Sequence, residues 1–242
     1  QSTPLVNGQN YSWYARAKNA GGNGPLSTYK SFAVAILPAA PALVSPSGTI
    51  STTTPTYTFT AVAGATGYSV RLWSNSANAS TDTIWFTPAE AGCPDNTGTC
   101  SIPQSTPLVN GQNYSWYARA KNAGGNGPLS TYKSFAVAIL PAAPTLVSPS
   151  GTISTTTPAY TFNAVTGATG YSVRLWSNSA NASTDTIWFT PAEAGCPDNT
   201  GTCSIPQATP LVNGQNYSWY ARAKNAGGNG PLSAYKSFSV YP

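Results

Sequence analysis

The sequence predicts an all-β chain built from two-layer β-sandwich domains arranged in tandem. Two observations support this prediction: a long internal repeat, and six or seven short runs of alternating apolar and polar residues in each repeat, separated by turn-forming residues. No segment has an apolar period of 3.6 residues that is long enough for a helix. Aromatic residues make up 12% of the chain, which argues against disorder.

The repeat has the length of an independent domain. Gln1, Gln104 and Gln207 occupy equivalent places 103 residues apart, and residues 38–137 differ from residues 141–240 at seven positions. Solenoid repeats are only about 20–50 residues long, so each unit is expected to bury its own core. We therefore predict two complete domains at 38–140 and 141–242, and the C-terminal part of another at 1–37.

The strands of one unit follow from the alternation. In "GYSVRLW" (67–73), Tyr68, Val70 and Leu72 share one face, and in "NYSWYARAKN" (113–122), Trp116 points inward while Tyr117 points outward. A proline-bearing segment at 38–48 is expected to be an extended edge or linker. The expected strands of the unit are 56–62, 67–73, 82–87, 100–103, 113–122 and 132–137.

The cysteines lie in two identical loops with the sequence "GCPDNTGTC". Cys93 and Cys100 flank a run of turn-forming residues, as do Cys196 and Cys203, so each pair is expected to form a local disulfide. Zinc is the alternative, but it needs four ligands, and with no histidine in the chain each unit offers only two thiols. Disulfides indicate an oxidising compartment, so we expect a secreted or cell-surface protein.

Three motifs resemble fibronectin type III domains, which have an immunoglobulin-like fold. "LVNGQNY" (108–114) is similar to their tyrosine corner, which would assign that role to Tyr114 and Tyr217. "ARAKNAGGNGPLS" (118–130) resembles the end of strand F and the start of strand G, and "GATGYSVRL" (64–72) resembles the entry into strand C. The chain departs from the family at Phe59 and Phe162, where strand B usually has a tryptophan.

The resemblance implies a mostly non-catalytic family of spacers, adhesion modules and enzyme appendages. It also implies that residues 1–37 are strands F and G of a further unit. Two strands alone would expose an apolar face and unpaired edges. We therefore expect a longer repeat protein seen in part. The less favoured alternative is that strands of another chain complete this unit.

No residue constellation predicts catalysis, a cofactor or a metal site. The acids of a unit, Asp82, Glu90 and Asp95, lie in or beside loops and imply no cleft, and the lack of histidine leaves nucleophilic triads without a base. Charged residues are only 7% of the chain, and a net charge of +5 over this length is too weak to indicate nucleic-acid binding. The sequence has no run of eighteen apolar residues, so it does not predict membrane insertion.

The outward face of two neighbouring strands is the most suggestive surface. It should bring aromatic and basic side chains together, with Trp85 and Lys121 beside them. Three interpretations remain open: ordinary cross-strand packing, contact with another domain or chain, and a sugar-binding platform. The predicted contact residues are Arg71, Trp73, Tyr117 and Arg119 in the first full unit and Arg174, Trp176, Tyr220 and Arg222 in the second.

Near-identical copying suggests a role in which copy number matters. We expect a non-catalytic extracellular structural or adhesive protein that forms a stalk or filament and whose partners are copies of itself. The alternative is a carbohydrate-binding or spacer tail of a secreted polysaccharide-degrading enzyme, with surface polysaccharide as the partner. The linker "AILPAAP" (138–144) should be semi-rigid. Asn78 and Asn181 lie in glycosylation acceptor patterns.

Overall fold

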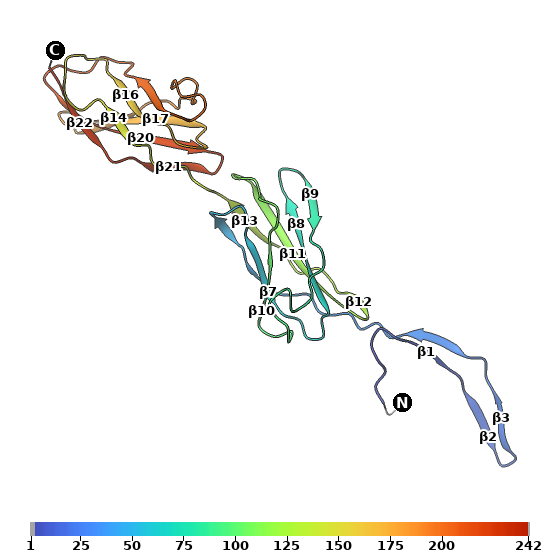
Figure 1. The fold of residues 1–242 in the computed structure, drawn as a ribbon. Helices are drawn as coiled ribbons and strands as arrows, with labels where there is room; N and C mark the ends of the chain where they lie inside the picture. Colours follow the sequence, from blue (N-terminus) through green and yellow to red (C-terminus); the bar gives the residue numbers. More distant parts are fainter. Residues whose placement is uncertain (1–2, 242) are drawn as a thin grey trace. The chain divides into compact units, whose positions relative to one another are not determined.

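A computed structural model describes residues 3–241. All regular secondary structure in that range is β-strand. The chain divides into two compact units, which are described separately (Figure 1). Unit 1 comprises Gln1–Ile50, Thr54–Leu108 and Asn113–Ala136, and unit 2 comprises Ser51–Thr53, Val109–Gln112 and Val137–Pro242. We call residues 38–137 the first full repeat and residues 141–240 the second full repeat.

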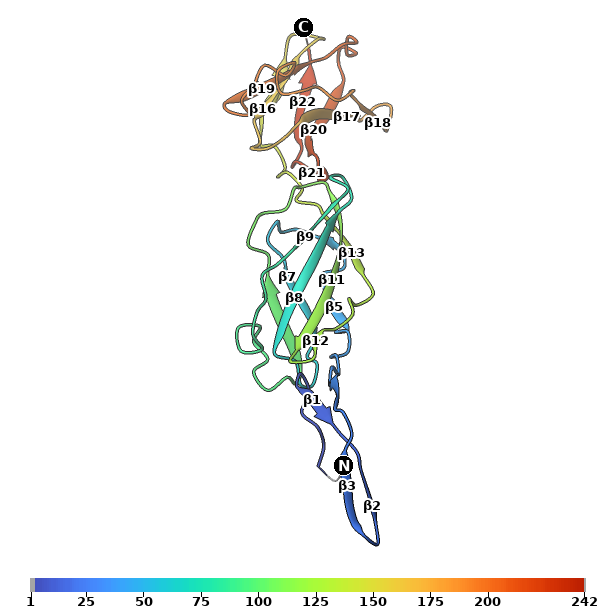
Figure 2. The ribbon, with the colours of Figure 1, turned by 90° about the vertical axis from the view of Figure 1, so that its right-hand side faces the viewer.

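The first full repeat is a sandwich of two sheets (Figures 1 and 2). One sheet has the strand order β10-β7-β5, and the other has the order β6-β13-β11-β8-β9, with β12 paired to β11. The bounds of the first sheet are β5 (Leu43–Ser45), β7 (Thr56–Thr60) and β10 (Thr99–Pro103). Those of the second are β6 (Gly48–Ile50), β8 (Gly67–Ser74), β9 (Ala79–Asp82), β11 (Asn113–Asn122), β12 (Gly125–Asn126) and β13 (Lys133–Val137).

The second full repeat has the same two sheets, with orders β14-β16-β19 and β15-β22-β20-β17-β18, and β21 paired to β20. Pairing is antiparallel except between β15 and β22, which run parallel. The chain is therefore a tandem of immunoglobulin-like, fibronectin type III-like sandwiches. The bounds are β14 (Leu146–Ser148), β15 (Gly151–Ile153), β16 (Ala159–Asn163), β17 (Gly170–Ser177), β18 (Ala182–Asp185), β19 (Thr202–Pro206), β20 (Asn216–Asn225), β21 (Gly228–Leu232) and β22 (Lys236–Val240).

An aromatic cluster between the two sheets forms the centre of each core. Trp116 is fully buried, and its ring centroid lies 5.1 Å from that of Tyr57 on the opposite sheet. The Trp116 Nε1–H donates to Pro46 O at 3.0 Å, so burial leaves the indole nitrogen satisfied. Trp219 makes the same bond to Pro149 O at 3.0 Å. The inward assignment of Trp116 is thus confirmed, and burial raises the pKa of Tyr57.

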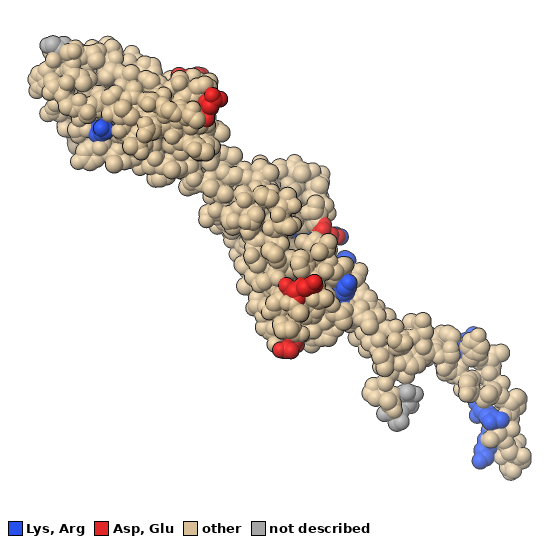
Figure 3. All heavy atoms as spheres, in the orientation of Figure 1, with Lys and Arg blue, Asp and Glu red and all other residues tan. Residues whose placement is uncertain are grey.

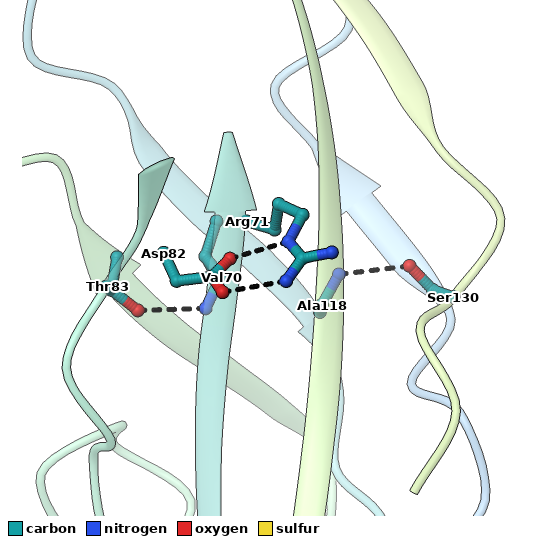
Figure 4. Close-up of polar contacts among 6 residues, drawn as sticks. All are labelled: Val70, Arg71, Asp82, Thr83, Ala118 and Ser130. Atoms are coloured by element: carbon teal, nitrogen blue, oxygen red, sulfur yellow. Dashed lines mark hydrogen bonds and ion pairs between the residues drawn. The ribbon is translucent and has the colours of Figure 1, made fainter. Parts of the chain in front are cut away.

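The predicted strand at 82–87 is wrong. The strand in this region is β9, which ends at Asp82, and Phe86 makes only an isolated antiparallel bridge to Tyr68. The reason is local: the Val70 N–H donates to the Thr83 hydroxyl at 2.9 Å rather than to a backbone carbonyl, which interrupts the ladder (Figure 4). The other expected strands are present, with shifts at their ends.

The disulfides are present as expected, between Cys93 and Cys100 and between Cys196 and Cys203. The first loop is also tied to strand β8. The Tyr68 hydroxyl donates to Asn96 Oδ1 at 2.7 Å, and Asn96 Nδ2 donates to Ala65 O at 2.9 Å. The loop is therefore a docked part of the sandwich, held by a disulfide and by partly buried hydrogen bonds.

Residues 10–33 form two strand pairs, and their assignment to strands F and G of a further unit stays a prediction. β1 (Asn10–Trp13) pairs with β4 (Lys30–Ala33), and β2 (Arg16–Asn19) pairs with β3 (Gly22–Leu26). Trp13 and Phe32 are 55% and 43% exposed, whereas their counterparts Trp116 and Phe135 are 0% and 3% exposed. Among the described residues, no second sheet covers this face.

Removing one disulfide should destabilise its repeat. Replacing Cys93 and Cys100 with serine should lower the free energy of unfolding of the first full repeat by about 2–3 kcal/mol, because the unfolded chain regains the entropy of a closed loop of about eight residues. Urea denaturation of this variant measures the effect. The second full repeat keeps its own disulfide and serves as the internal control. An unchanged urea midpoint for the first repeat would contradict the prediction.

Candidate functional site: an aromatic face and a repeated joint

The antiparallel pairing of β8 with β11 builds the candidate contact face. Arg71 lies opposite Tyr117, and Trp73 lies opposite Ser115. Directly opposed residues point to the same side of a sheet, so these side chains share the outer face. The structure therefore brings Arg71, Trp73 and Tyr117 together. Arg119, opposite Ser69, extends the face along β11. We call these four residues and their counterparts the aromatic-basic face.

Arg71 is held in a paired ion bridge. Its Nε and Nη2 donate to the two carboxylate oxygens of Asp82 on β9, at 2.7 and 2.8 Å (Figure 4). These hydrogen bonds lower the pKa of the Asp82 carboxyl, although partial burial opposes the shift, and they raise the pKa of Arg71. Arg174 and Asp185 repeat the arrangement. The bridge neutralises the charge of both groups at this end of the face.

A shallow hollow lies beside this bridge. Its walls are the half-buried rings of Trp73 and Tyr117 and the exposed ring of Tyr132, and the Tyr117 and Tyr132 ring centroids are 6.0 Å apart. Its volume is about 500 Å³. We call it the aromatic hollow. Its lining is Trp73, Asn75, Ser115, Tyr117, Tyr132 and Ser134.

The polar groups of the aromatic hollow come from three neighbouring positions. Ser115 on β11 and Ser134 on β13 are directly opposed, and their hydroxyl oxygens are 2.9 Å apart. Asn75 follows the end of β8, where its backbone N–H donates to Asn113 O at 3.2 Å. Each hydroxyl keeps further hydrogen-bonding capacity after the Ser115–Ser134 bond is made. Uncharged donors and acceptors therefore line the hollow between the rings.

The second full repeat has the same arrangement. Trp176 lies opposite Ser218, and the Ser218 and Ser237 hydroxyl oxygens are 2.9 Å apart. The Tyr220 and Tyr235 ring centroids are also 6.0 Å apart. The contacts that build the aromatic hollow therefore recur in the second full repeat.

The remaining basic groups lie outside the hollow. Arg222 Nε donates to Gly230 O at 2.8 Å, whereas the matching Arg119 Nε is buried without a hydrogen-bond partner in the described chain. The Lys121 ammonium lies over the Trp85 ring, 4.6 Å from its centroid. Trp85, expected beside the face, is thus engaged by Lys121. Figure 3 shows how sparse charged side chains are on the side of the molecule that it presents.

The acidic residues have local structural roles. Glu90 accepts from the Thr87 N–H and hydroxyl at 2.7 and 2.8 Å, and these bonds lower the pKa of Glu90. Asp82 is paired with Arg71, and Asp95 lies in the disulfide loop. Within residues 3–241, no three His, Cys, Asp or Glu residues gather to hold a metal ion. The same part of the chain includes no helix long and apolar enough to cross a membrane.

The tyrosines proposed for the corner motif are buried beside strand β13 or β22. The Tyr217 hydroxyl accepts from the Val212 N–H at 3.0 Å, and Tyr11 accepts from the Val6 N–H at 2.7 Å. Tyr114 is 4% exposed, and its ring stacks on Phe135 at 5.6 Å. Asn78 and Asn181 occupy exposed turns with positive φ of 49° and 50°. Their use as glycosylation sites stays a prediction.

A second candidate site is the joint between residues 1–37 and the first full repeat. Asn7 forms a two-point contact with the linker: its Nδ2 donates to Ile36 O, and its Oδ1 accepts from the Ile36 N–H, each at 2.7 Å. Asn122, at the start of the next F–G loop, donates to the same Ile36 carbonyl at 3.0 Å. Ile36 is thus held from both sides, so the linker is not a free tether.

The same contacts recur within unit 2. Asn110 makes the two-point contact with Ile139 at 2.9 and 2.8 Å, and Asn225 donates to Ile139 O at 2.9 Å. In the two full repeats, Gly124 and Gly227 lie against the linker. A Cβ on Gly124 would come within 2.7 Å of both Asn7 Oδ1 and Ile36 O. Only glycine therefore fits this approach without displacement.

Sequence reasoning identified part of these sites. The sequence predicted the residues of the aromatic-basic face but not Tyr132 and Tyr235. These tyrosines lie two residues before the outward-facing Ser134 and Ser237, so the alternation of side chains along a strand could have placed them on the same face. Sequence reasoning expected a stiff linker from its prolines, but it missed the asparagine contacts. Asn7 and Asn110 stand in "LVNG", a sequence that also fits an ordinary turn, so the sequence alone had no signal for this role.

The comparisons with known proteins add little to this geometry. No family model matches the sequence, and no curated protein matches it. Among solved structures, the chain is similar to the chicken CNTN1 FN1–FN3 domains, with 19% identity over 98% of this chain and 78% of that chain, at a TM-score of 0.35. The fold assignment rests on the strand order and register described above.

The Arg71–Asp82 bridge predicts a measurable pH effect. Because the folded-state pKa of Asp82 is lowered, the bridge contributes stability above the ordinary carboxyl pKa of about 3.9, and this contribution is lost as the pH falls through the folded value. An NMR titration should show the Asp82 pKa rising toward its ordinary value in Arg71→Gln. Asp185, still paired with Arg174, is the matched control and should not move. An unchanged Asp82 pKa would refute the assignment.

The joint predicts that Gly124→Ala loosens the linker without unfolding the repeat. The added methyl group would displace Asn7 or Ile36, so the Ile36 amide should exchange with solvent at least tenfold faster, as hydrogen exchange would measure. Gly21→Ala is the matched control, since a Cβ there meets only Asn19 Oδ1 at 3.3 Å in the same local sequence. Equal exchange in the two variants would count against the joint.

Proposed function

We propose that the chain is part of an extracellular, non-catalytic structural and adhesive protein in which tandem sandwiches form a surface stalk or filament. The observation that carries the proposal is the repetition of one joint. Asn7, Ile36 and Asn122 make contacts that Asn110, Ile139 and Asn225 make again, with hydrogen bonds of similar length. A linker fixed in the same way after each repeat suits a spacer of defined geometry.

The chemistry of the surface supports the same proposal. Two local disulfides favour an oxidising environment. The joint consists of amide and backbone groups, whose hydrogen bonds do not titrate at ordinary pH and are not screened by salt as ion pairs are. Such a spacer would keep its geometry through changes in external salt and acidity.

Self-association is the proposed route from stalk to filament. The aromatic-basic face presents tryptophan, tyrosine and arginine, the residues that most often anchor protein interfaces. Two copies of the face in one chain would allow side-by-side contacts at repeated intervals.

Electron microscopy of the source material, imaged without fractionation, tests the proposal. Long filaments with a regular axial repeat of one or a few domains are expected. Filaments reassembled from purified chain should be weakened by Trp73→Ala if the face is the lateral contact, whereas Trp85→Ala should leave them intact. Dispersed short rods in the source material would contradict the filament proposal.

A further inference from the structure

We infer that the aromatic hollow is a carbohydrate-binding site, present once in each full repeat, for neutral pyranosides with equatorial hydroxyl groups. The inference deepens the adhesive part of the proposed function by naming a ligand for it. It does not depend on filament formation, because each hollow is built within one repeat, and a sugar bound there would compete with any lateral contact that covers Trp73 and Tyr117.

The rings supply the first element of such a site. A pyranose with equatorial hydroxyls has faces made of C–H groups, and such a face packs on an aromatic ring. Trp73 on β8 and Tyr117 on β11 lie diagonally across the strand pair, since Trp73 opposes Ser115 and Tyr117 opposes Arg71. Tyr132 adds an inclined wall, with its ring plane at 57° to that of Tyr117.

The polar lining supplies the second element. The Asn75 amide and the Ser115 and Ser134 hydroxyls are available between the rings, and they can donate to and accept from sugar hydroxyls. Three of the six lining residues are aromatic and three are polar, so a sugar could stack on a ring and hydrogen-bond to the lining at the same time, and a volume of about 500 Å³ is within the usual range of small-ligand sites.

The charge distribution selects a neutral ligand. All six side chains that line the hollow are uncharged. Arg71, which lies opposite Tyr117 on β8, is neutralised by its two hydrogen bonds to Asp82. Lys121 is engaged by Trp85 near the far end of β11. The lining itself therefore supplies no cation that would favour an acidic sugar over a neutral one.

The paired strands β8, β11 and β13 fix the backbone positions of Trp73, Tyr117 and the two serines of the hollow. Ser115 and Ser134 are tied across β11 and β13, and the pair recurs as Ser218 and Ser237 at the same 2.9 Å separation. A preformed site loses little side-chain freedom on binding. Two such sites on one chain would bind a long polymer more tightly than a short oligomer, by avidity.

Calorimetric titration of the purified chain with cellohexaose and xylohexaose tests the inference, with a galacturonate hexamer as the acidic counterpart. At least one neutral probe should bind at two sites per chain. Trp73→Ala combined with Trp176→Ala should weaken binding tenfold or more, and Trp73→Ala alone should halve the number of sites. Tyr132→Ala with Tyr235→Ala provides a second test, since both rings are 62% exposed and their removal should not unfold the repeats.

Trp85→Ala combined with Trp188→Ala is the matched control, because these tryptophans belong to the same repeats but lie outside the hollow. This variant should bind within about twofold of the parent chain. The inference is overturned if neither neutral probe binds at millimolar concentration, if only the acidic hexamer binds, or if either hollow variant binds as the parent does. Filaments in the source material without sugar binding would overturn this inference alone and leave the filament proposal standing.

Discussion

The antiparallel pairing of β8 with β11 is the constraint on which the rest of each repeat depends. The pairing fixes a two-residue alternation on both strands at once. Val70 and Trp116 then face the second sheet, and Arg71 and Tyr117 face outward. A shift of one residue in either strand would exchange these sets. The core and the outer aromatic surface are therefore two consequences of one register.

The burial of Trp116 shows how strongly that register is specified. Its indole is fully buried beside the Tyr57 ring of the opposite sheet, and its N–H donates to the carbonyl of Pro46 just after β5. An outward Trp116 would lose this hydrogen bond and expose a large apolar surface. In the N-terminal strand pair, Trp13 has the same register against β4, yet it is 55% exposed, since no second sheet among residues 3–241 covers it.

The sequence was sufficient to predict most of the fold, because the alternation in residues 67–73 and 113–122 is uninterrupted. It failed at 82–87, where Ile84, Trp85 and Phe86 look like a strand. Instead, the Thr83 hydroxyl accepts a hydrogen bond from the Val70 N–H, which would otherwise pair with a backbone carbonyl of the next strand. A pattern of apolar and polar residues cannot reveal such a side-chain bond. The aromatic-basic face was predictable from the alternation of inward and outward side chains along these two segments. The role of Asn7 was not, because it depends on residues brought together only by folding.

The joint holds the linker between residues 1–37 and the first full repeat in a defined conformation. Ile36 is held by Asn7 from the turn before β1 and by Asn122 at the end of β11, and both contacts use backbone atoms of the linker. Side-chain substitutions in the linker would leave these bonds in place, so conformation is set by Asn7, Asn122 and Gly124 instead.

The most direct test of this account is the distance distribution between spin labels on either side of the first joint. Thr28→Cys and Ser76→Cys place labels at exposed positions, one before and one after Ile36. Pulsed electron spin resonance should give a single narrow distribution, which broadens when Asn7 is replaced by alanine. A distribution that is already broad in the parent chain, and is unchanged by Asn7→Ala, would contradict a fixed joint.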